Sequence, residues 1–237
     1  MSFTDLKTSQ FNVFVDKFEQ LYSYILEMQP IMDKQDTSFK IAVVLNYCSY
    51  DLFATLCFME LLLSKLFDEK YRCSIQFYTQ TNSMFFHATP DDVAWLRAYY
   101  SEETHVQNVF KMFETRLNEK EWAFSKRLPF YYPEEDMKLF SDYDLCIFKG
   151  DYNYRKLVKG MHCDYETSLR EVIPKNVPFN ALCTMRVIKS DIIFDLKEDE
   201  QHSMNEMRKD FKLKNANCLD LNFIDLRENN GQHEKSS

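Results

Sequence analysis

The residues best suited to chemistry in this sequence lie in one short segment, residues 149–157, which read KGDYNYRKL. Residues 149–160 contain four basic side chains and one acidic side chain, although the whole chain of 237 residues carries a net charge of −8. Gly150 allows the backbone to turn sharply or to approach a ligand closely. Arg155 can hold a phosphate or a carboxylate through two parallel hydrogen bonds, and Lys149 adds a point charge. The segment therefore predicts a site for an anionic ligand.

Two further cationic residues, Arg186 and Lys189, follow an apolar run at residues 179–184. The first segment follows an apolar run in the same way, at residues 145–148, and both runs read as buried strands. Because open α/β sheets bind ligands beyond the carboxyl ends of their strands, we expect the two cationic groups to meet at one edge of a sheet. A plainer interpretation, that these charges are solvated loop residues with capping roles, fits the pattern equally well.

The rest of the chain supplies elements that would position these residues. Apolar runs at 39–45 and 72–78 flank an apolar helical segment at 50–67, which is typical of a βαβ unit. Alternation of this kind favours an α/β fold, a Rossmann-like α/β/α sandwich with a mainly parallel sheet. The pattern also predicts a helix at 9–29 that stops at Pro30, a helix start at 89–92 and a fifth strand at 192–196. The expected organisation is an N-terminal helical segment at 1–36, a core domain at 37–215 and a polar, partly disordered tail at 216–237.

Composition limits the partners and the compartment. The negative net charge argues against nucleic acid and anionic membranes as partners, and no apolar run is long enough to cross a bilayer. The first ten residues lack the pattern of a signal peptide, and the seven cysteines are odd in number and dispersed. These features predict reduced thiols and a cytoplasmic protein, with the nucleus as an alternative.

Several common kinds of site are excluded or disfavoured. With only three glycines, at positions 150, 160 and 231, the chain can form neither a dinucleotide-binding loop nor a Walker loop. The five histidines are scattered without a metal-ligand spacing, so we expect no metal role for them: His87, His105, His162, His202 and His233. The adjacent His162 and Cys163 are not expected to form a catalytic pair, because neighbouring residues rarely point at one another.

Residues 148–157, FKGDYNYRKL, resemble the signature of the damage-control phosphatase family, in the subgroup that includes the acidic-residue methyltransferase proteins. In that subgroup an FKGD-aliphatic-NYRKL block is followed about thirty residues later by CTxRTxK, and this chain has CTMRVIK at 183–189. The resemblance covers about residues 38–190. It implies a Rossmann-like fold, a phosphorylated small-molecule ligand and a divalent metal such as Mn²⁺ or Ni²⁺. By position, it implies that substrate is contacted by Asp151, Tyr152, Asn153, Tyr154, Arg155 and Lys189.

The chain departs from the family at the positions implied to hold metal. The family has an Asp-Asn pair in a DNxGFEL context and an Asp in an SDV context. When Tyr50-Asp51-Leu52 is aligned with FEL, Asn46 takes the place of the family's aspartate and Tyr47 that of its asparagine. Gln80 takes the place of the aspartate in the SDV context. A shift of one residue would instead keep Asn46 as the asparagine. Amide and phenol oxygens bind hard divalent ions far more weakly than carboxylates do, so metal-activated hydrolysis is not favoured.

Two principal hypotheses follow. The first is a metal-dependent phosphatase acting on sugar phosphates, in which Lys149, Arg155 and Lys189 neutralise the phosphate and Asp151 positions or protonates a substrate oxygen. The second is a catalytically impaired relative that binds a phosphorylated or anionic ligand as a regulatory or binding protein. The residues favour the second slightly. Carboxyl methylation of proteins, the other activity attributed to the family, has no separate support in this sequence.

Overall fold

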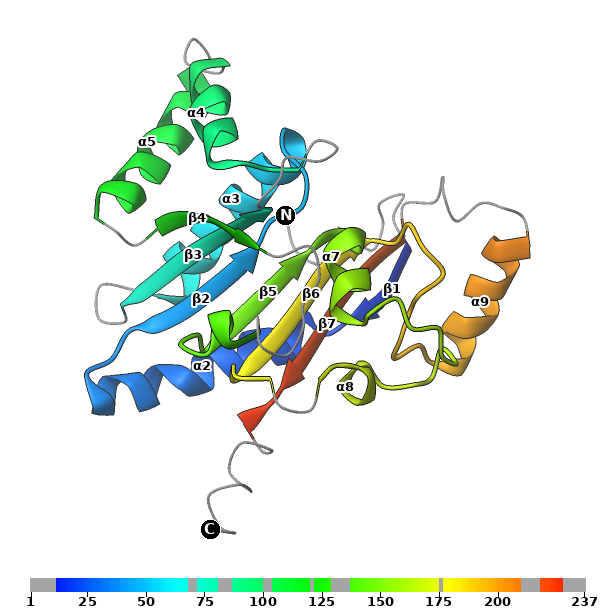
Figure 1. Ribbon diagram of the computed structural model, residues 1–237. Helices are drawn as coiled ribbons and strands as arrows, with labels where there is room; N and C mark the ends of the chain where they lie inside the picture. Colours follow the sequence, from blue (N-terminus) through cyan, green and yellow to red (C-terminus); the bar gives the residue numbers. More distant parts are fainter. Residues whose placement is uncertain are drawn as a thin grey trace.

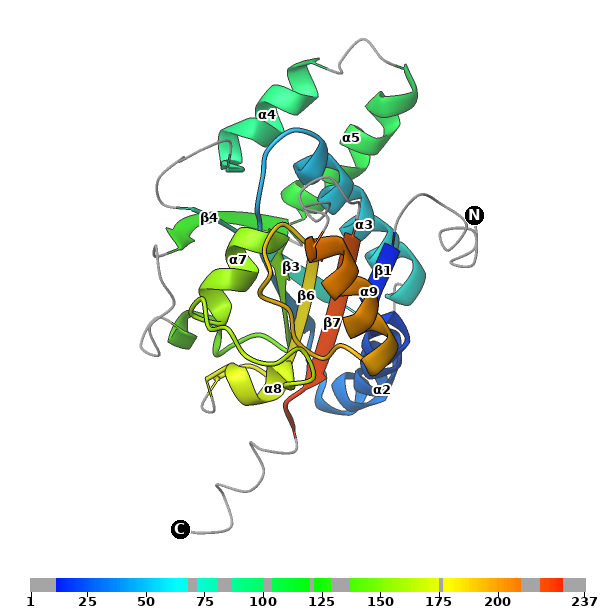
Figure 2. The ribbon, with the colours of Figure 1, turned by 90° about the vertical axis from the view of Figure 1, so that its right-hand side faces the viewer.

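A seven-stranded β-sheet forms the centre of the computed structural model, with helices on both of its faces (Figure 1, Figure 2). The structure describes residues 12–67, 72–80, 87–99, 104–119, 122–128, 137–174, 177–209 and 218–227. The strands lie across the sheet in the order β1-β7-β6-β5-β2-β3-β4. The β6–β7 pair is antiparallel, and the other neighbouring strands are parallel. Two strands, β1 and β7, therefore run opposite to the remaining five.

The elements have the following bounds. The strands are β1 (Asn12–Asp16), β2 (Phe39–Val44), β3 (Cys73–Gln80), β4 (Trp122–Leu128), β5 (Leu145–Lys149), β6 (Ala181–Val187) and β7 (Cys218–Asp225). The helices are α2 (Phe18–Gln35), α3 (Tyr50–Leu66), α4 (Pro90–Tyr99), α5 (Thr104–Asn118), the short 3-10 helix η1 (Lys138–Phe140), α7 (Gly150–Leu157), α8 (Leu169–Val172) and α9 (Glu198–Lys209).

The central strands bury side chains on both faces, which is why they read as continuous apolar runs. Along β2, Ile41 and Val43 pack into a core shared with α2, α3 and α5. The alternate residues Ala42 and Val44 pack on the opposite face, into a core shared with η1, α7 and α8. The expected α/β fold with a mainly parallel sheet is therefore confirmed. Strands β2, β3, β5 and β6, helix α3 and the start of α4 follow the predicted segments closely.

The N-terminal segment differs from its prediction. In place of one helix over 9–29 there is strand β1, followed by α2, which continues through Pro30 to Gln35. A proline inside a helix costs about 3 kcal/mol. Burial of Met28 and Met32 against the sheet, on either side of Pro30, offsets that cost. Tertiary packing thus outweighs the local stop signal.

Two further predictions fail near the C-terminal end. Residues 192–196 form no strand, although Ile192, Ile193 and Phe194 are buried. Asp195 has a φ of 61°, which is incompatible with extended backbone. The stretch expected to be a polar tail from residue 216 contains β7, which lies between β1 and β6 inside the sheet. The polar pattern of β7 was misleading because its polar residues, such as Asp220, are buried and paired. The division into domains stays a prediction.

Candidate functional site

The segments that follow four parallel strands meet at the carboxyl edge of the sheet. Asn46 and Tyr47 follow β2, and His87 follows β3 and forms an isolated antiparallel bridge with Tyr47. Helix α7 begins directly at the end of β5, and Lys189 lies two residues beyond β6. The backbone segments that follow these strands therefore lie at one edge of the sheet, as the sequence predicted.

Asn46 and Gly150 pack against each other with no room for a larger residue. Gly150 has a φ of +83°, and a Cβ placed on it would lie 2.2 Å from Cγ of Asn46. The amide of Asn46 is itself buried, and its Oδ1 has no hydrogen-bond partner in the described part of the chain. A polar atom is thus presented, without a partner, beside the start of α7.

The N-terminus of α7 points to the same place. Lys149 is its N-cap and makes no side-chain capping bond. Asn153 is directed inward instead, and its Nδ2 donates to the carbonyl oxygens of Leu45, at 2.9 Å, and Lys149, at 2.7 Å. This amide therefore ties β2 to the strand–helix junction. The N-terminal end of a helix carries partial positive charge and attracts anions.

Asp151 is the centre of a hydrogen-bond network and not an open carboxylate. Its Oδ1 accepts from Nη1 of Arg186 at 2.8 Å, Oγ of Ser190 at 3.0 Å and the backbone N–H of Lys189 at 3.2 Å. Its Oδ2 accepts from Nε of Arg155 at 3.0 Å. The carboxylate is 7% exposed. This geometry suits a residue that fixes the loop after β6 against α7; the predicted role as a catalytic acid stays untested.

Arg186 lies beneath this network with no exposed side-chain surface. Its Nε donates to Oδ2 of Asp220 at 2.8 Å, and its Nη2 donates to the carbonyl oxygen of Ile192. Its guanidinium also lies 3.5 Å from the ring centroid of Tyr154, which is fully buried. Arg186, Asn153 and Tyr154 were all predicted to lie at the site. The structure places them there as buried supports, and their direct contact with a substrate stays a prediction.

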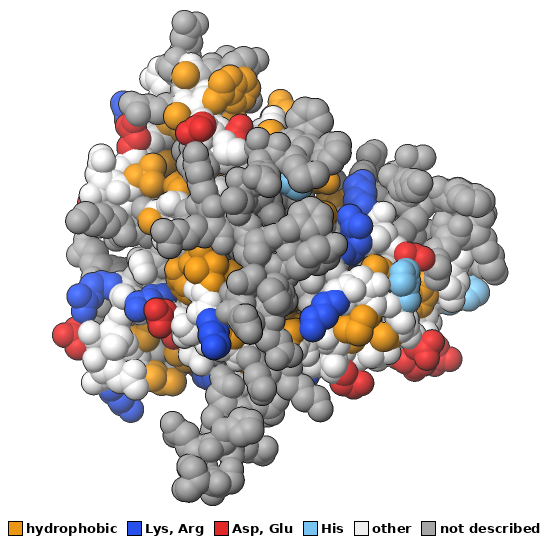
Figure 3. All heavy atoms as spheres, in the orientation of Figure 1, with side chains coloured by type: hydrophobic (Ala, Val, Ile, Leu, Met, Phe, Trp, Pro, Cys, Tyr) orange, Lys and Arg blue, Asp and Glu red, His pale blue; other side chains and the backbone are white. Residues whose placement is uncertain are grey.

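Four cations, of which Arg155 and Lys189 are exposed, lie around this buried support. The side chain of Arg155 is 46% exposed, and that of Lys189 is exposed. Nζ of Lys149 lies 3.5 Å from Oδ1 of Asp51. Burial lowers the pKa of Lys156 to about 8. In Figure 3, Lys and Arg side chains lie beside the region where Figure 1 draws α7. An anion approaching this edge would meet positive charge.

An aromatic stack completes the edge and was not predicted from the sequence. The rings of Tyr47 and His87 are 5.9 Å apart between centroids and 12° from parallel, and His87 also stacks with Tyr152 at 5.0 Å. His87 is 8% exposed, and its Nδ1 has no partner among the described residues. Burial, and then the charge of Lys156, lower the pKa of His87, which favours the neutral form of its ring. The available signal was a histidine shortly after a buried strand, which is weak by itself.

The donors at this edge do not fit a hard divalent cation. Asn46 offers a neutral amide oxygen, and both oxygens of Asp151 already accept from cationic or polar donors. Asp51 accepts from the N–H of Tyr47 at 3.1 Å and faces the ammonium of Lys149. The side chain of Gln80, predicted to stand at a metal position, lies outside the described residues. Within the described ranges no three His, Cys, Asp or Glu side chains come together as a metal would require.

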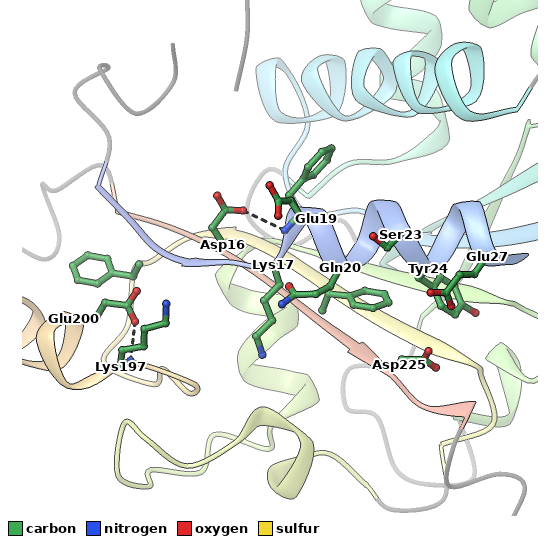
Figure 4. A pocket seen from close by; sticks show the side chains of 13 residues that line it. Asp16, Lys17, Glu19, Gln20, Ser23, Tyr24, Glu27, Lys197, Glu200 and Asp225 are labelled. Carbon is green, nitrogen blue, oxygen red and sulfur yellow. Dashed lines mark hydrogen bonds between the residues drawn. The ribbon is translucent and has the colours of Figure 1, made fainter. Parts of the chain in front are cut away.

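The remaining features lie away from this edge. A groove of about 1150 Å³ is lined by β1, α2, β7 and the start of α9 (Figure 4). Three of its charged residues are paired: Asp225 and Glu27 accept from Arg227, and Lys17 pairs with Asp195. The segment containing His162 and Cys163 is exposed. Of the helices that the structure describes, none has the length and hydropathy needed to cross a membrane.

Comparison with known proteins identifies the family. A family model described as the damage-control phosphatase ARMT1-like domain matches residues 3–204, which is most of the chain. The chain is also 24% identical over 201 residues to damage-control phosphatase ARMT1 of Xenopus laevis. That alignment covers 78% of this chain and 44% of the relative, so the chain spans less than half of the relative's length. The chain belongs to the damage-control phosphatase ARMT1-like domain family.

Proposed function

We propose that this chain binds a phosphorylated small molecule at the carboxyl edge of its sheet and turns it over weakly or not at all by a metal-dependent route. The observation that carries the proposal is the pairing of a cationic rim with a donor set poor in carboxylates. Lys149, Arg155 and Lys189 supply the rim, and Asn46 and Tyr47 supply the donors.

The positive rim suits a phosphate for two reasons. The N-terminus of α7 offers backbone N–H groups and partial positive charge at the point where β5 ends. Arg155 projects from the first turns of that helix, is held by Asp151 and is half exposed. A guanidinium held in place in this way binds a phosphate oxygen with little further loss of side-chain entropy.

Metal-activated hydrolysis is the less favoured half of the family's chemistry for this chain. A divalent ion that activates water needs anionic oxygen ligands. At this edge the carboxylates of Asp51 and Asp151 are each bonded to a nitrogen donor of the chain and lie close to a cation. The geometry therefore supports the binding protein over the metal-dependent enzyme.

The test uses fructose 1-phosphate as the probe. We expect it to raise the melting temperature of the wild-type protein, and Arg155→Ala to lose that shift. We also expect little or no phosphate release above background when Mn²⁺, Co²⁺ or Ni²⁺ is added. Strong metal-stimulated release that Asp151→Ala abolishes would overturn the impaired-enzyme part, and absence of any binding would overturn the whole proposal.

A reversal variant sharpens the test. The triple variant Asn46→Asp/Tyr47→Asn/Gln80→Asp restores the residue types that the family has at its metal-binding positions, according to the resemblance. If their loss is what impairs metal use, this variant should bind Mn²⁺ at least about 10-fold more tightly than the wild type, by calorimetry. Equal and weak Mn²⁺ binding in both proteins would show that other features of the edge, such as His87, also disfavour the metal.

A second candidate function is the family's metal-dependent hydrolysis of sugar phosphates. The partnerless Oδ1 of Asn46 favours it, because a buried amide oxygen without a donor can serve as one ligand of a cation. The same Mn²⁺ titrations and release assays decide between the two. Carboxyl methylation stays a hypothesis that rests on the family alone.

A further inference from the structure

The stack of Tyr47, His87 and Tyr152 gives the anion site a flat aromatic wall. The Tyr47 and His87 rings are nearly parallel, and Tyr47 is 47% exposed although it is a large aromatic residue. One face of the Tyr47 ring packs toward His87, which fixes the orientation of the ring. The remainder of the Tyr47 ring is exposed. Aromatic rings of this kind accept planar ligands by stacking.

The aromatic wall lies next to the positive rim. Asp51 bonds the backbone N–H of Tyr47 through Oδ2 at 3.1 Å and faces the ammonium of Lys149 through Oδ1 at 3.5 Å. One carboxylate therefore holds the aromatic residue and the cation together. At the other end of the stack, Nζ of Lys156 lies 5.3 Å from the Tyr152 ring centroid. The aromatic stack thus has a cation near each of its ends.

Two polar atoms at this surface have no partner within the described residues. They are Nδ1 of His87 and Oδ1 of Asn46, and both side chains are more than nine-tenths buried. The residues are linked directly, since the N–H of Ala88 donates to the carbonyl oxygen of Asn46 at 3.0 Å. Buried polar groups normally have a hydrogen-bond partner, so a ligand or water that bonds to these two is favoured.

We propose that the phosphorylated ligand of this site carries a planar heteroaromatic ring, which stacks on Tyr47 while its phosphate binds the cations at the start of α7. This rests on the proposed function above and narrows its ligand class from phosphorylated molecules in general to ring-bearing monophosphates. The exposed Tyr47 supplies the stacking face, and the His87 ring that packs against it holds it in place.

The test compares adenosine 5′-monophosphate with ribose 5-phosphate, which carries the same phosphate and sugar without the ring. Calorimetry on the wild type should give a dissociation constant at least about 10-fold lower for the ring-bearing ligand. Tyr47→Ala should reduce that ratio toward one, and Tyr47→Phe should keep it. Tyr22→Ala removes a tyrosine of similar exposure (42%) from α2 and should also keep it.

The outcomes separate the two proposals. Equal affinities for the two ligands in the wild type would overturn the ring-binding inference and leave phosphate binding standing. A ratio that Tyr47→Ala does not change would place the ring elsewhere and would equally overturn the inference. Binding of neither ligand would overturn the inference, and failure of fructose 1-phosphate to bind as well would overturn the proposed function. The wild-type ratio decides even if Tyr47→Ala does not fold.

Discussion

The Asn46 amide occupies the space that a side chain on residue 150 would need. A Cβ on Gly150 would lie 2.2 Å from both Cγ and Nδ2 of Asn46, and the φ of Gly150 is +83°. Because the clash involves a buried neighbour and the backbone conformation disfavours other residues, we expect Gly150→Ala to destabilise the fold by roughly 2–4 kcal/mol. Urea denaturation measures this directly.

A double-mutant cycle identifies the source of that cost. Asn46→Ala removes two of the three atoms nearest to the added Cβ. The combined variant should therefore be less destabilised than the sum of its parts, by at least about 1 kcal/mol. Strict additivity would mean that backbone strain, and not contact with Asn46, accounts for the loss. Gly160→Ala is the control, because its φ is also positive (+66°) but its Cβ would meet nothing within 4 Å.

Asp220 is expected to matter for stability although it lies beyond the residues matched by the family model. Its carboxylate and the Arg186 guanidinium both have 0% exposed side-chain surface. Breaking a buried ion pair costs about 3–5 kcal/mol when the remaining charge has no other partner, but Arg186 keeps its ion pair with Asp151. We therefore expect Asp220→Asn to lose stability at or below the lower end of that range in chemical denaturation. A loss below about 1 kcal/mol would show that Arg186 needs no more than its bonds to Asp151 and Ile192.

Arg155 should matter little for stability and strongly for phosphate binding. Its ion pair with Asp151 is partly exposed, so Arg155→Ala should cost less than about 1 kcal/mol of stability. If Arg155 binds phosphate, the same variant should weaken ribose 5-phosphate binding roughly 10- to 100-fold. Arg72→Ala breaks a surface pair with Asp36 of 2.7 Å and is the matched control. Similar affinity losses in both variants would indicate a general effect of net charge.

Phosphate affinity is expected to fall between pH 7 and pH 9. Burial lowers the pKa of Lys156 to about 8, so this cation is largely lost over that interval. The phosphate monoester is already doubly charged at pH 7 and does not change further. We expect a fall of roughly 3- to 10-fold by calorimetry, and Lys156→Gln should flatten the profile. An unchanged wild-type affinity would remove Lys156 from the site.

The same shift makes an independent prediction for stability. Between pH 8 and about 10.5, the ordinary value for lysine, the unfolded chain binds the proton that folded Lys156 has released. The contribution of Lys156 should therefore make the free energy of unfolding rise with pH through this interval. At pH 7, Lys156→Met should be more stable than wild type by about 1–3 kcal/mol. Comparing the two proteins at each pH isolates the contribution of Lys156 from other titrating groups.

The sequence predicted the strands that carry the site because those strands are buried on both faces. Continuous apolar runs such as Phe39–Val44 are unambiguous, and the carboxyl-edge rule then places the residues that follow them. The family signature in and around α7 was equally readable. The strands at one end of the sheet were harder to predict, because β1 and β7 mix polar and apolar residues and are recognisable as strands only through their pairing partners.

The roles of individual residues could not be predicted in the same way. Asp151 looks like an exposed catalytic carboxylate in the sequence, but its partners Arg186 and Ser190 lie 35 and 39 residues away. The stacking of His87 depends on a bridge to Tyr47 across forty residues of chain. Propensity and spacing carry no information about such long-range contacts. Burial and pairing decide which polar residues support the site and which face a ligand.

The pairing of β1 with β7 has a consequence for how the protein is made. Within the described residues, β1 bonds to the sheet through β7, whose residues are synthesised about two hundred positions later. Among the described strands, β1 therefore leaves the ribosome long before the strand with which it pairs, a non-local arrangement that slows folding. Asp220 arrives with β7, so Arg186 gains this partner only after β7 has been made. The buried support beneath the anion site thus depends on two segments that are far apart in the sequence.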